Sequence, residues 1–458
     1  MILWTGAAPD GTPRRMTVGQ QNFQSERGQK VAKPHEAKSE MLPQDLQTPR
    51  DHYQLECVVC KARTPGRAGA LCTCGGMLDT AYDLTKVKLY DSPNGFVRFA
   101  DLLPVKDARL YPSEMRYSPC VHAVELGKKW GLNKLYLKDE TVFPTGTTKD
   151  RSAVIALSML LEENTKIFAT SSTGNAGTGY AYALQMKQFS SIEMHLFVGD
   201  PFYERTHYCD APNVKVFALR GGTFVEAGMA SAVYAKQRGI RADDGYFNPG
   251  KREGAKLALY EATDQIKEPI DWYVQSISSG LGVDGTFKGA KELHQISHIS
   301  KLPRLLCVQE DTCAPQVAAW EDLCSRINPH HVVERPEGIA LATHRGDPTR
   351  AYPYLRAKVQ ESRGTYIAVS EKDIRSAQME ILELAGIHCC FSGAAAVAGT
   401  IKEAQRGMVD ENDVVVVNLT GRDRSPETAT KNMTWLDRKG DAWVSEDGSI
   451  NLPIPKKK

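Results

Sequence analysis

The 458-residue chain carries little net charge and has no long apolar run. Its 57 Lys and Arg residues against 55 Asp and Glu residues leave a net charge of +2, so nothing in the composition favours binding to nucleic acid or to an anionic membrane. No apolar run approaches the roughly 20 residues that span a bilayer. The first residues lack a basic segment, so we expect no export signal and a cytoplasmic protein.

Disulfides are not expected for the eleven cysteines, because a chain without an export signal stays in a reducing compartment. Two close pairs, Cys57-x-x-Cys60 and Cys72-x-Cys74, could instead supply four thiolates to a structural zinc ion. The alternative is a small cysteine-containing module that has lost its metal.

Composition changes along the chain and predicts four regions. The first 50 residues are polar and lack apolar periodicity, which is typical of a disordered arm. The predicted regions are this arm (1–50), a cysteine-rich, zinc-ribbon-like module (51–90), an α/β body (91–430) with a smaller subdomain at about 150–225, and a C-terminal extension (431–458).

Short apolar runs alternate with helical patterns in the α/β body, which indicates mostly parallel sheets. In such sheets, ligands bind at the carboxyl ends of the strands, where loops lead into helices. The predicted strands are 166–171, 193–199, 271–277, 304–309 and 413–419.

Three of these strands end in loops of small and hydroxylated residues. "SSTGNAGTG" (171–179) and "SSGLGVDG" (278–285) each precede a helical pattern, and backbone amides at a helix start attract anions. The third loop begins with Thr420, whose hydroxyl could hydrogen-bond a heteroaromatic nitrogen without adding charge. Each loop by itself could equally be an ordinary turn, so the prediction of a ligand site rests on their combination.

"PTGTTKDR" (144–151) places Lys149 at the start of a helical pattern. A helix start disfavours a cation, and burial there would lower the pKa of the amine towards the reactive neutral form. A reactive lysine, a phosphate cradle, a ring-contacting Asn175 and a neutral hydroxyl together fit pyridoxal 5'-phosphate.

The order of "PTGTTKDR", "SSTGNAG", "SSGLG", "FSGAAAVAG" and "NLTGR" resembles the fold-type II pyridoxal-phosphate enzymes, and within them the threonine synthase and cysteate synthase branch. The segment 248–262, "NPGKREGAKLALYEA", is similar to threonine synthases, whereas 302–322 is closer to cysteate synthases. The resemblance implies a tryptophan synthase beta-like α/β fold with two doubly wound subdomains, the cofactor between them, and a small N-terminal cysteine module.

The resemblance also implies a role for individual residues. Lys149 would carry the cofactor and act as the catalytic base. The other implied groups are cofactor contacts (Asn175, Ser278, Ser279, Gly280, Leu281, Gly282, Thr420), substrate-carboxylate contacts (Ser172, Thr173, Gly174) and metal ligands (Cys57, Cys60, Cys72, Cys74). The chain departs from the family at Thr147-Thr148, where Ser-Phe is usual, and after Gly421, where "RDRSPE" replaces a glycine-rich run.

The implied activity is that of a lyase or transferase acting by elimination or replacement on an amino acid with an activated side chain. A threonine synthase-like reaction would convert O-phosphohomoserine and water to threonine and phosphate. The alternatives are β-replacement on O-phosphoserine or another activated serine, and a catalytically silent binding homologue. A phosphate leaving group needs a second anion site, for which Lys251, Arg252, Arg345 and Arg422 are candidates. The resemblance further implies a homodimer.

Overall fold

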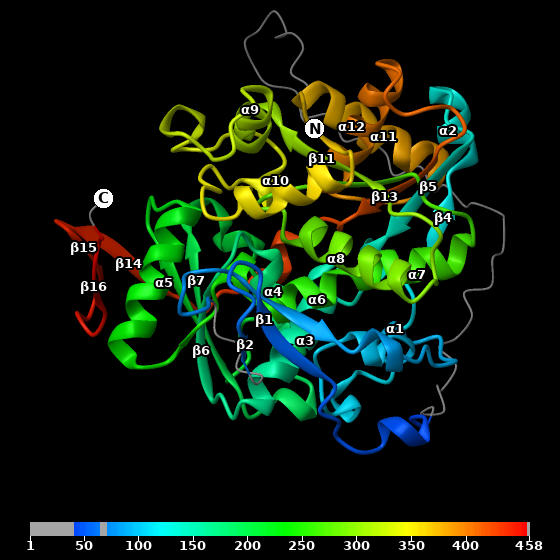
Figure 1. Cartoon of the computed structure of the whole chain (residues 1–458). Coiled ribbons are helices and arrows are strands. Elements are labelled where there is room, and N and C mark those ends of the chain that lie inside the picture. The colour runs from blue at the N-terminus through cyan, green and yellow to red at the C-terminus, as the bar shows by residue number, and fades with distance from the viewer. Residues whose placement is uncertain (1–40, 65–70, 456–458) are drawn as a thin grey trace, which may run out of the picture. The chain divides into compact units, whose positions relative to one another are not determined.

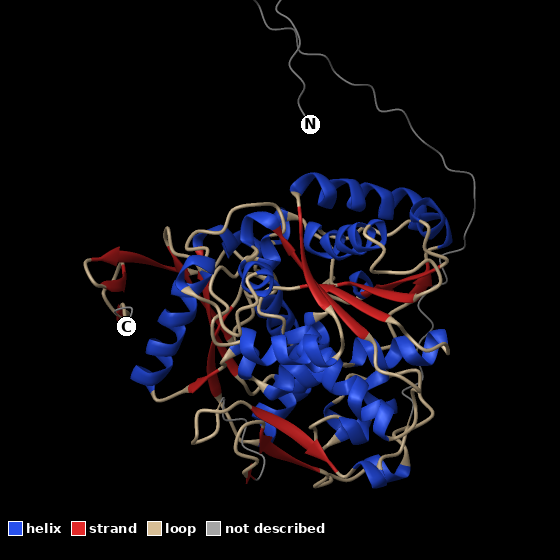
Figure 2. Ribbon diagram, turned by 45° about the horizontal axis from the view of Figure 1, so that its top comes forward, coloured by secondary structure: helices blue, strands red, loops and turns tan. Residues whose placement is uncertain are grey.

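The structure is a computed structural model that describes residues 41–64 and 71–455. Most of the predicted N-terminal arm, residues 1–40, therefore lies outside the described residues. Three sheets and the helices between them make up the described chain (Figures 1 and 2). Among the described residues, no helix is both long enough and apolar enough to cross a membrane.

The larger subdomain is built on a six-stranded sheet in which every neighbouring pair is parallel except the pair at one edge, β4 and β5. Strand β13 has the sequence VVVVNL and is buried along its whole length, as expected for a parallel strand covered on both faces. In spatial order the strands are β12 (Thr365–Val369), β11 (Arg304–Glu310), β10 (Trp272–Ser276), β13 (Val414–Leu419), β5 (Lys134–Asp139) and β4 (Cys120–His122).

The smaller subdomain has a seven-stranded sheet that draws on two distant parts of the sequence. In spatial order its strands are β16 (Asn451–Pro453), β15 (Ala442–Ser445), β14 (Thr434–Lys439), β8 (Val214–Leu219), β7 (Glu193–Gly199), β6 (Ile167–Ser171) and β9 (Arg241–Ala242). Strand β14, from the predicted C-terminal extension, pairs in parallel with β8 and so completes this sheet (Figure 1). The sheet also continues beyond residue 225 to β9.

The cysteine-rich module is a three-stranded antiparallel sheet of β1 (Tyr53–Cys57), β2 (Arg63–Thr64) and β3 (Leu78–Tyr82). It is held to the larger body by Arg252, whose guanidinium is fully buried and donates to the carbonyl oxygen of Leu78.

Helices fill the space between the two larger sheets and cover their outer faces (Figure 2). The α-helices are α1 (Gly95–Arg98), α2 (Val124–Trp130), α3 (Lys149–Glu162), α4 (Asn175–Ala183), α5 (Phe224–Arg238), α6 (Pro249–Ala255), α7 (Leu257–Ile266), α8 (Leu281–Gln295), α9 (Pro315–Glu321), α10 (Tyr352–Glu361), α11 (Glu371–Ala385) and α12 (Phe391–Gln405).

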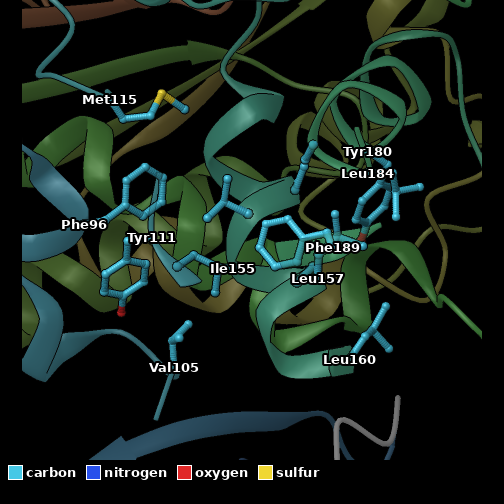
Figure 3. Packing of buried hydrophobic residues seen from close by; sticks show 14 of the residues in the cluster. Phe96, Val105, Tyr111, Met115, Ile155, Leu157, Leu160, Tyr180, Leu184 and Phe189 are labelled. Carbon is cyan, nitrogen blue, oxygen red and sulfur yellow. The ribbon is translucent and has the colours of Figure 1, made fainter. Parts of the chain in front are cut away.

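Helix α3 is the central helix of the body and is buried nearly all round. Figure 3 shows Ile155, Leu157 and Leu160 of α3 within one apolar cluster, with Phe189 on one side and Phe96 on the other. After its polar first turn α3 is almost entirely apolar, and a helix that is apolar all round belongs in the interior of a protein.

The first turn of α3 is fixed by a buried ion-pair network. Arg151 Nε donates to Glu140 at 2.8 Å, and its Nη1 and Nη2 both donate to Glu261 at 2.6 Å. Lys138 Nζ, at the end of β5, donates to the same Glu261 at 2.9 Å. All four side chains are at most 1% exposed, so the network locks the start of α3 against β5 and α7.

Candidate active site

One cavity opens where the carboxyl ends of β6, β10 and β13 meet the start of α3. The predicted site residues on its wall are Lys149, Ser172, Thr173, Asn175, Ser278, Ser279, Gly280, Leu281, Gly282 and Thr420. Gly174 is the one predicted contact that does not line this cavity among the described residues. The fold therefore brings together, from four separate segments, residues that lie up to 271 positions apart, as Lys149 and Thr420 do.

Lys149 is held in place by the loop before it and by the end of β13. The backbone N–H of Thr148 donates to the carbonyl oxygen of Thr420 at 3.0 Å, and that of Arg422 donates to Gly146 O at 2.9 Å. Burial, together with the charge of Lys251, lowers the pKa of the Lys149 amine to about 8. About a tenth of the amine is therefore neutral at pH 7, far more than for a lysine with the ordinary pKa.

The loop after β6 prepares the start of α4. Ser172 Oγ accepts the backbone N–H groups of Gly174 and Gly177, each at 3.0 Å. Gly174 has φ = +112°, which a side chain would strain, so glycine is required at this turn. The hydroxyl proton of Ser172 remains available to a ligand.

Asn175 is oriented by a residue that sequence reasoning missed. Arg424 Nη2 donates to Asn175 Oδ1 at 2.6 Å, so the amide nitrogen of Asn175 is left to donate elsewhere. A second nitrogen, Arg424 Nη1, donates to Thr145 O at 3.1 Å and joins the loop before Lys149 to the same arginine. Arg424 lies in the "RDRSPE" run, where the chain departs from the family pattern, so no motif pointed to it.

The loop between β10 and α8 ends in a helix start that no side chain caps. Gly280 has φ = +86°, and a Cβ there would lie 2.1 Å from Leu355 Cδ2. A Cβ at Gly282 would lie 2.5 Å from Gln275 Nε2, so the Gln275 side chain would have to move. The first-turn N–H groups of α8 therefore face the cavity without a protein acceptor in the described chain, which makes this turn suitable for a phosphate.

Thr420 supplies a neutral polar group at the end of β13. Its carbonyl oxygen accepts from Thr148 N and from Thr147 Oγ1, at 3.0 and 3.3 Å. Its hydroxyl has no partner among the described residues and lies on the cavity wall.

The four cysteines of the N-terminal module converge. The sulfur atoms of Cys57, Cys60, Cys72 and Cys74 all lie within 4.8 Å of one another. Backbone N–H groups also point at two of the sulfurs, from Val59 to Cys57 at 3.4 Å and from Gly76 to Cys74 at 3.4 Å. Four converging thiols of this kind match the donor set of a structural zinc site.

A model of the family described as "Pyridoxal-phosphate dependent enzyme" matches residues 113–421. The chain belongs to this family. It has the fold-type II architecture of these enzymes, and its sequence is similar to those of threonine synthases and cysteate synthases. The predictions of fold class, of family and of pyridoxal phosphate as cofactor are thus confirmed, whereas the structural zinc stays a prediction.

Relatives within the family carry two different names. A threonine synthase of Methanosarcina acetivorans is 28% identical over 81% of this chain and 91% of that protein. A cysteate synthase of Methanospirillum hungatei is 22% identical over 81% of this chain and 89% of that protein. The fold is shared with maize serine racemase, with a TM-score of 0.57 and 18% identity over 68% of this chain and 89% of that one.

The cavity residues fit the family's cofactor. The uncapped start of α8 suits the phosphate group, and the free amide nitrogen of Asn175 suits a ring oxygen. The unpartnered hydroxyl of Thr420 suits the ring nitrogen, and the Lys149 amine lies on the same wall. The side chains of Lys149, Asn175 and Thr420 are half-buried on the cavity wall, where a polar ligand would supply the hydrogen-bond partners that they lack among the described residues.

Proposed function

We propose that the protein catalyses elimination or replacement on an amino acid with a phosphorylated side chain, in the manner of a threonine synthase. The substrate would be O-phosphohomoserine, and the products threonine and phosphate. In this reaction the Cγ–O bond breaks and phosphate leaves with the electron pair, Cβ loses one proton, and water adds its hydroxyl to Cβ and a proton to Cγ. The proton lost from Cβ is balanced by protonation of the released phosphate. The single observation that carries the proposal is Lys149, whose amine has a pKa of about 8 and which lines the same cavity as the three cofactor-type contacts.

Each residue has a task in this scheme. Pyridoxal phosphate, when bound, supplies the electron sink that makes the Cα proton of an amino acid removable. Lys149 takes that proton, because a pKa of about 8 lets it act as base and as acid near neutral pH. Ser172 and Thr173 bind the substrate carboxylate. The Thr420 hydroxyl is neutral, so it would not stabilise a protonated ring nitrogen as a carboxylate would. This favours elimination and replacement over amino-group transfer.

A second candidate is β-replacement on O-phosphoserine with an external nucleophile. The cysteate synthase relatives, at 22 and 25% identity, favour it. So does Thr148, which stands beside Lys149 where threonine synthases usually have an aromatic residue. The smaller side chain would leave room for a nucleophile other than water.

Incubation of the holoenzyme with O-phospho-L-homoserine and, separately, with O-phospho-L-serine distinguishes the two. Phosphate release and amino-acid products are followed together, with Lys149→Ala as the inactive control. Threonine from the first substrate supports the threonine synthase-like function. Phosphate released only from the second, and only with sulfite or another nucleophile added, moves the protein to the β-replacement branch.

Three accompanying properties are part of the proposal. The cysteine module holds one structural zinc ion, which metal analysis of the purified protein and of a Cys57→Ser variant would test. The enzyme is a homodimer, which sedimentation would test. Its eleven cysteines, without a disulfide among those described, suit a cytoplasmic protein, which fractionation of the source cells would test.

A further inference from the structure

Arg345 lies on a short segment, Gly338 to Gly346, that is held by contacts with one buried carboxylate. Glu310, at the end of β11, accepts the backbone N–H groups of Ile339 and Ala340 at 2.8 and 2.9 Å. The same carboxylate is 3.1 Å from His344 Nε2. Three contacts to one fully buried side chain hold the segment rigidly, so the position of Arg345 is fixed before any ligand binds.

The Arg345 side chain lines the same cavity as Lys149. Its Nε donates to Asp347 O at 3.2 Å, and its guanidinium lies 5.5 Å from the centre of the Phe224 ring. Among the described residues, neither terminal nitrogen has a hydrogen-bond acceptor and no carboxylate lies within ion-pair distance. Burial accordingly lowers the pKa of Arg345, with Asp347 and Asp244 only partly opposing this effect. The positive charge of Arg345 is therefore available to bind an anionic ligand.

The other three cationic candidates already have partners. Arg252 is fully buried beneath the cysteine module and serves the packing of that module. Lys251 does line the cavity, but its charge is matched by the buried carboxylate of Asp243. Arg422 is not among the residues that line the cavity, and its Nε donates to Thr141 O at 3.1 Å. Arg345 is thus the candidate that both lines the cavity and has no described carboxylate within ion-pair distance.

We propose that Arg345 binds the anionic group at the side-chain end of the substrate, which under the proposed function is its phosphate. The segment of Arg345 contacts the loop proposed to hold the substrate carboxylate, since Thr173 Oγ1 donates to Ala342 O at 3.2 Å. The carboxylate and the phosphate of one amino acid would therefore bind to two loops that are joined by a hydrogen bond. A guanidinium suits this role because it can donate to two phosphate oxygens at once.

The proposal rests on the proposed function for the identity of the anion, and the experiment separates the two. Inorganic phosphate is titrated into the holoenzyme by calorimetry, because the cofactor already occupies the phosphate cradle at α8. The parent protein is compared with Arg345→Gln and Arg345→Lys. The matched control is Arg350→Gln, an arginine five residues further along that is exposed and pairs with Asp244 at 3.5 Å.

Arg345→Gln should weaken phosphate binding about 10- to 100-fold, the usual effect of losing a charge-assisted contact. Arg345→Lys should recover part of it, and Arg350→Gln should match the parent. In turnover, Arg345→Gln should raise KM for the phosphorylated amino acid far more than for the O-acetyl analogue, which lacks the anion. The visible absorbance of the bound cofactor confirms that each variant is folded.

Unchanged phosphate affinity in Arg345→Gln, or a parent holoenzyme that binds no phosphate, would overturn the proposal. An equal loss with phosphorylated and acetylated substrates would also overturn it, because the arginine would then not act on the anion. If the parent turns over neither phosphorylated amino acid but loses phosphate binding on Arg345→Gln, the anion site stands and the proposed function fails.

Discussion

Lys149 costs the protein stability when the cofactor is absent, and Lys149→Met should relieve that cost in a pH-dependent way. The pKa of this amine falls from its ordinary value of 10.5 to about 8 in the folded chain. The folded protein therefore binds fewer protons than the unfolded chain between these two values. The penalty is fully present below pH 8, shrinks as the pH rises from 8, and is gone above the unfolded pKa.

The shift sets the size of the effect. The pKa falls by about 2.5, and each pKa unit corresponds to about 1.4 kcal/mol. The penalty on the free energy of unfolding is therefore at most about 3 kcal/mol at pH 7. At pH 10 the same relation gives a penalty of less than about 1 kcal/mol. Methionine is close to lysine in length and carries no charge, so the variant removes the penalty without opening a cavity.

The assay is urea unfolding of the cofactor-free protein at pH 7 and pH 10, for the parent and for Lys149→Met. The free energy of unfolding should rise in the variant by up to about 3 kcal/mol at pH 7 and by less than about 1 kcal/mol at pH 10. Lys236→Met, an exposed lysine on α5, is the control and should change stability equally at both pH values. A gain of the same size at both pH values, or a loss at pH 7, would refute the assignment of Lys149 as a destabilised buried amine.

Three further outcomes are expected. Arg424→Gln removes the 2.6 Å bond that orients Asn175 and should weaken cofactor binding about 10-fold, measured by fluorescence titration of the cofactor-free protein; unchanged affinity would show that Asn175 needs no such support. Glu261→Gln leaves the buried Arg151 without its bidentate partner and should cost about 3–5 kcal/mol in denaturant unfolding, whereas a loss below 1 kcal/mol would mean that water reaches the network. Gly285→Ala would place a Cβ 2.0 Å from a backbone oxygen of α6 and should cost about 1–3 kcal/mol by the same measurement.

Much of the body could be predicted from local patterns. The strand predicted at 193–199 is found as β7 with the same bounds, and that predicted at 413–419 is β13 within one residue. Continuous apolar runs between glycine-rich turns reveal buried parallel strands because both faces of such strands must be covered. The three loops and Lys149 could be located for the same reason, since each follows a strand or begins a helix.

Other features depend on partners that are distant in the sequence. Nothing local to "RDRSPE" indicates that Arg424 orients Asn175, because the contact joins residues 249 positions apart. The pairing of β14 with β8 is equally hidden, since a polar hairpin near the end of the chain could lie anywhere on the surface.

The sequence by itself determined the family, the cofactor chemistry and the residues that could carry it, because these depend on residue type and on the order of strands and loops. Only the tertiary structure decided which of the four cationic candidates lies on the cavity wall without a carboxylate beside it. Charge neutralisation depends on which groups come within a few ångströms in space. That is why Lys251, with Asp243 beside it, and Arg345, with no such partner, differ in the folded chain although both are ordinary cations in the sequence.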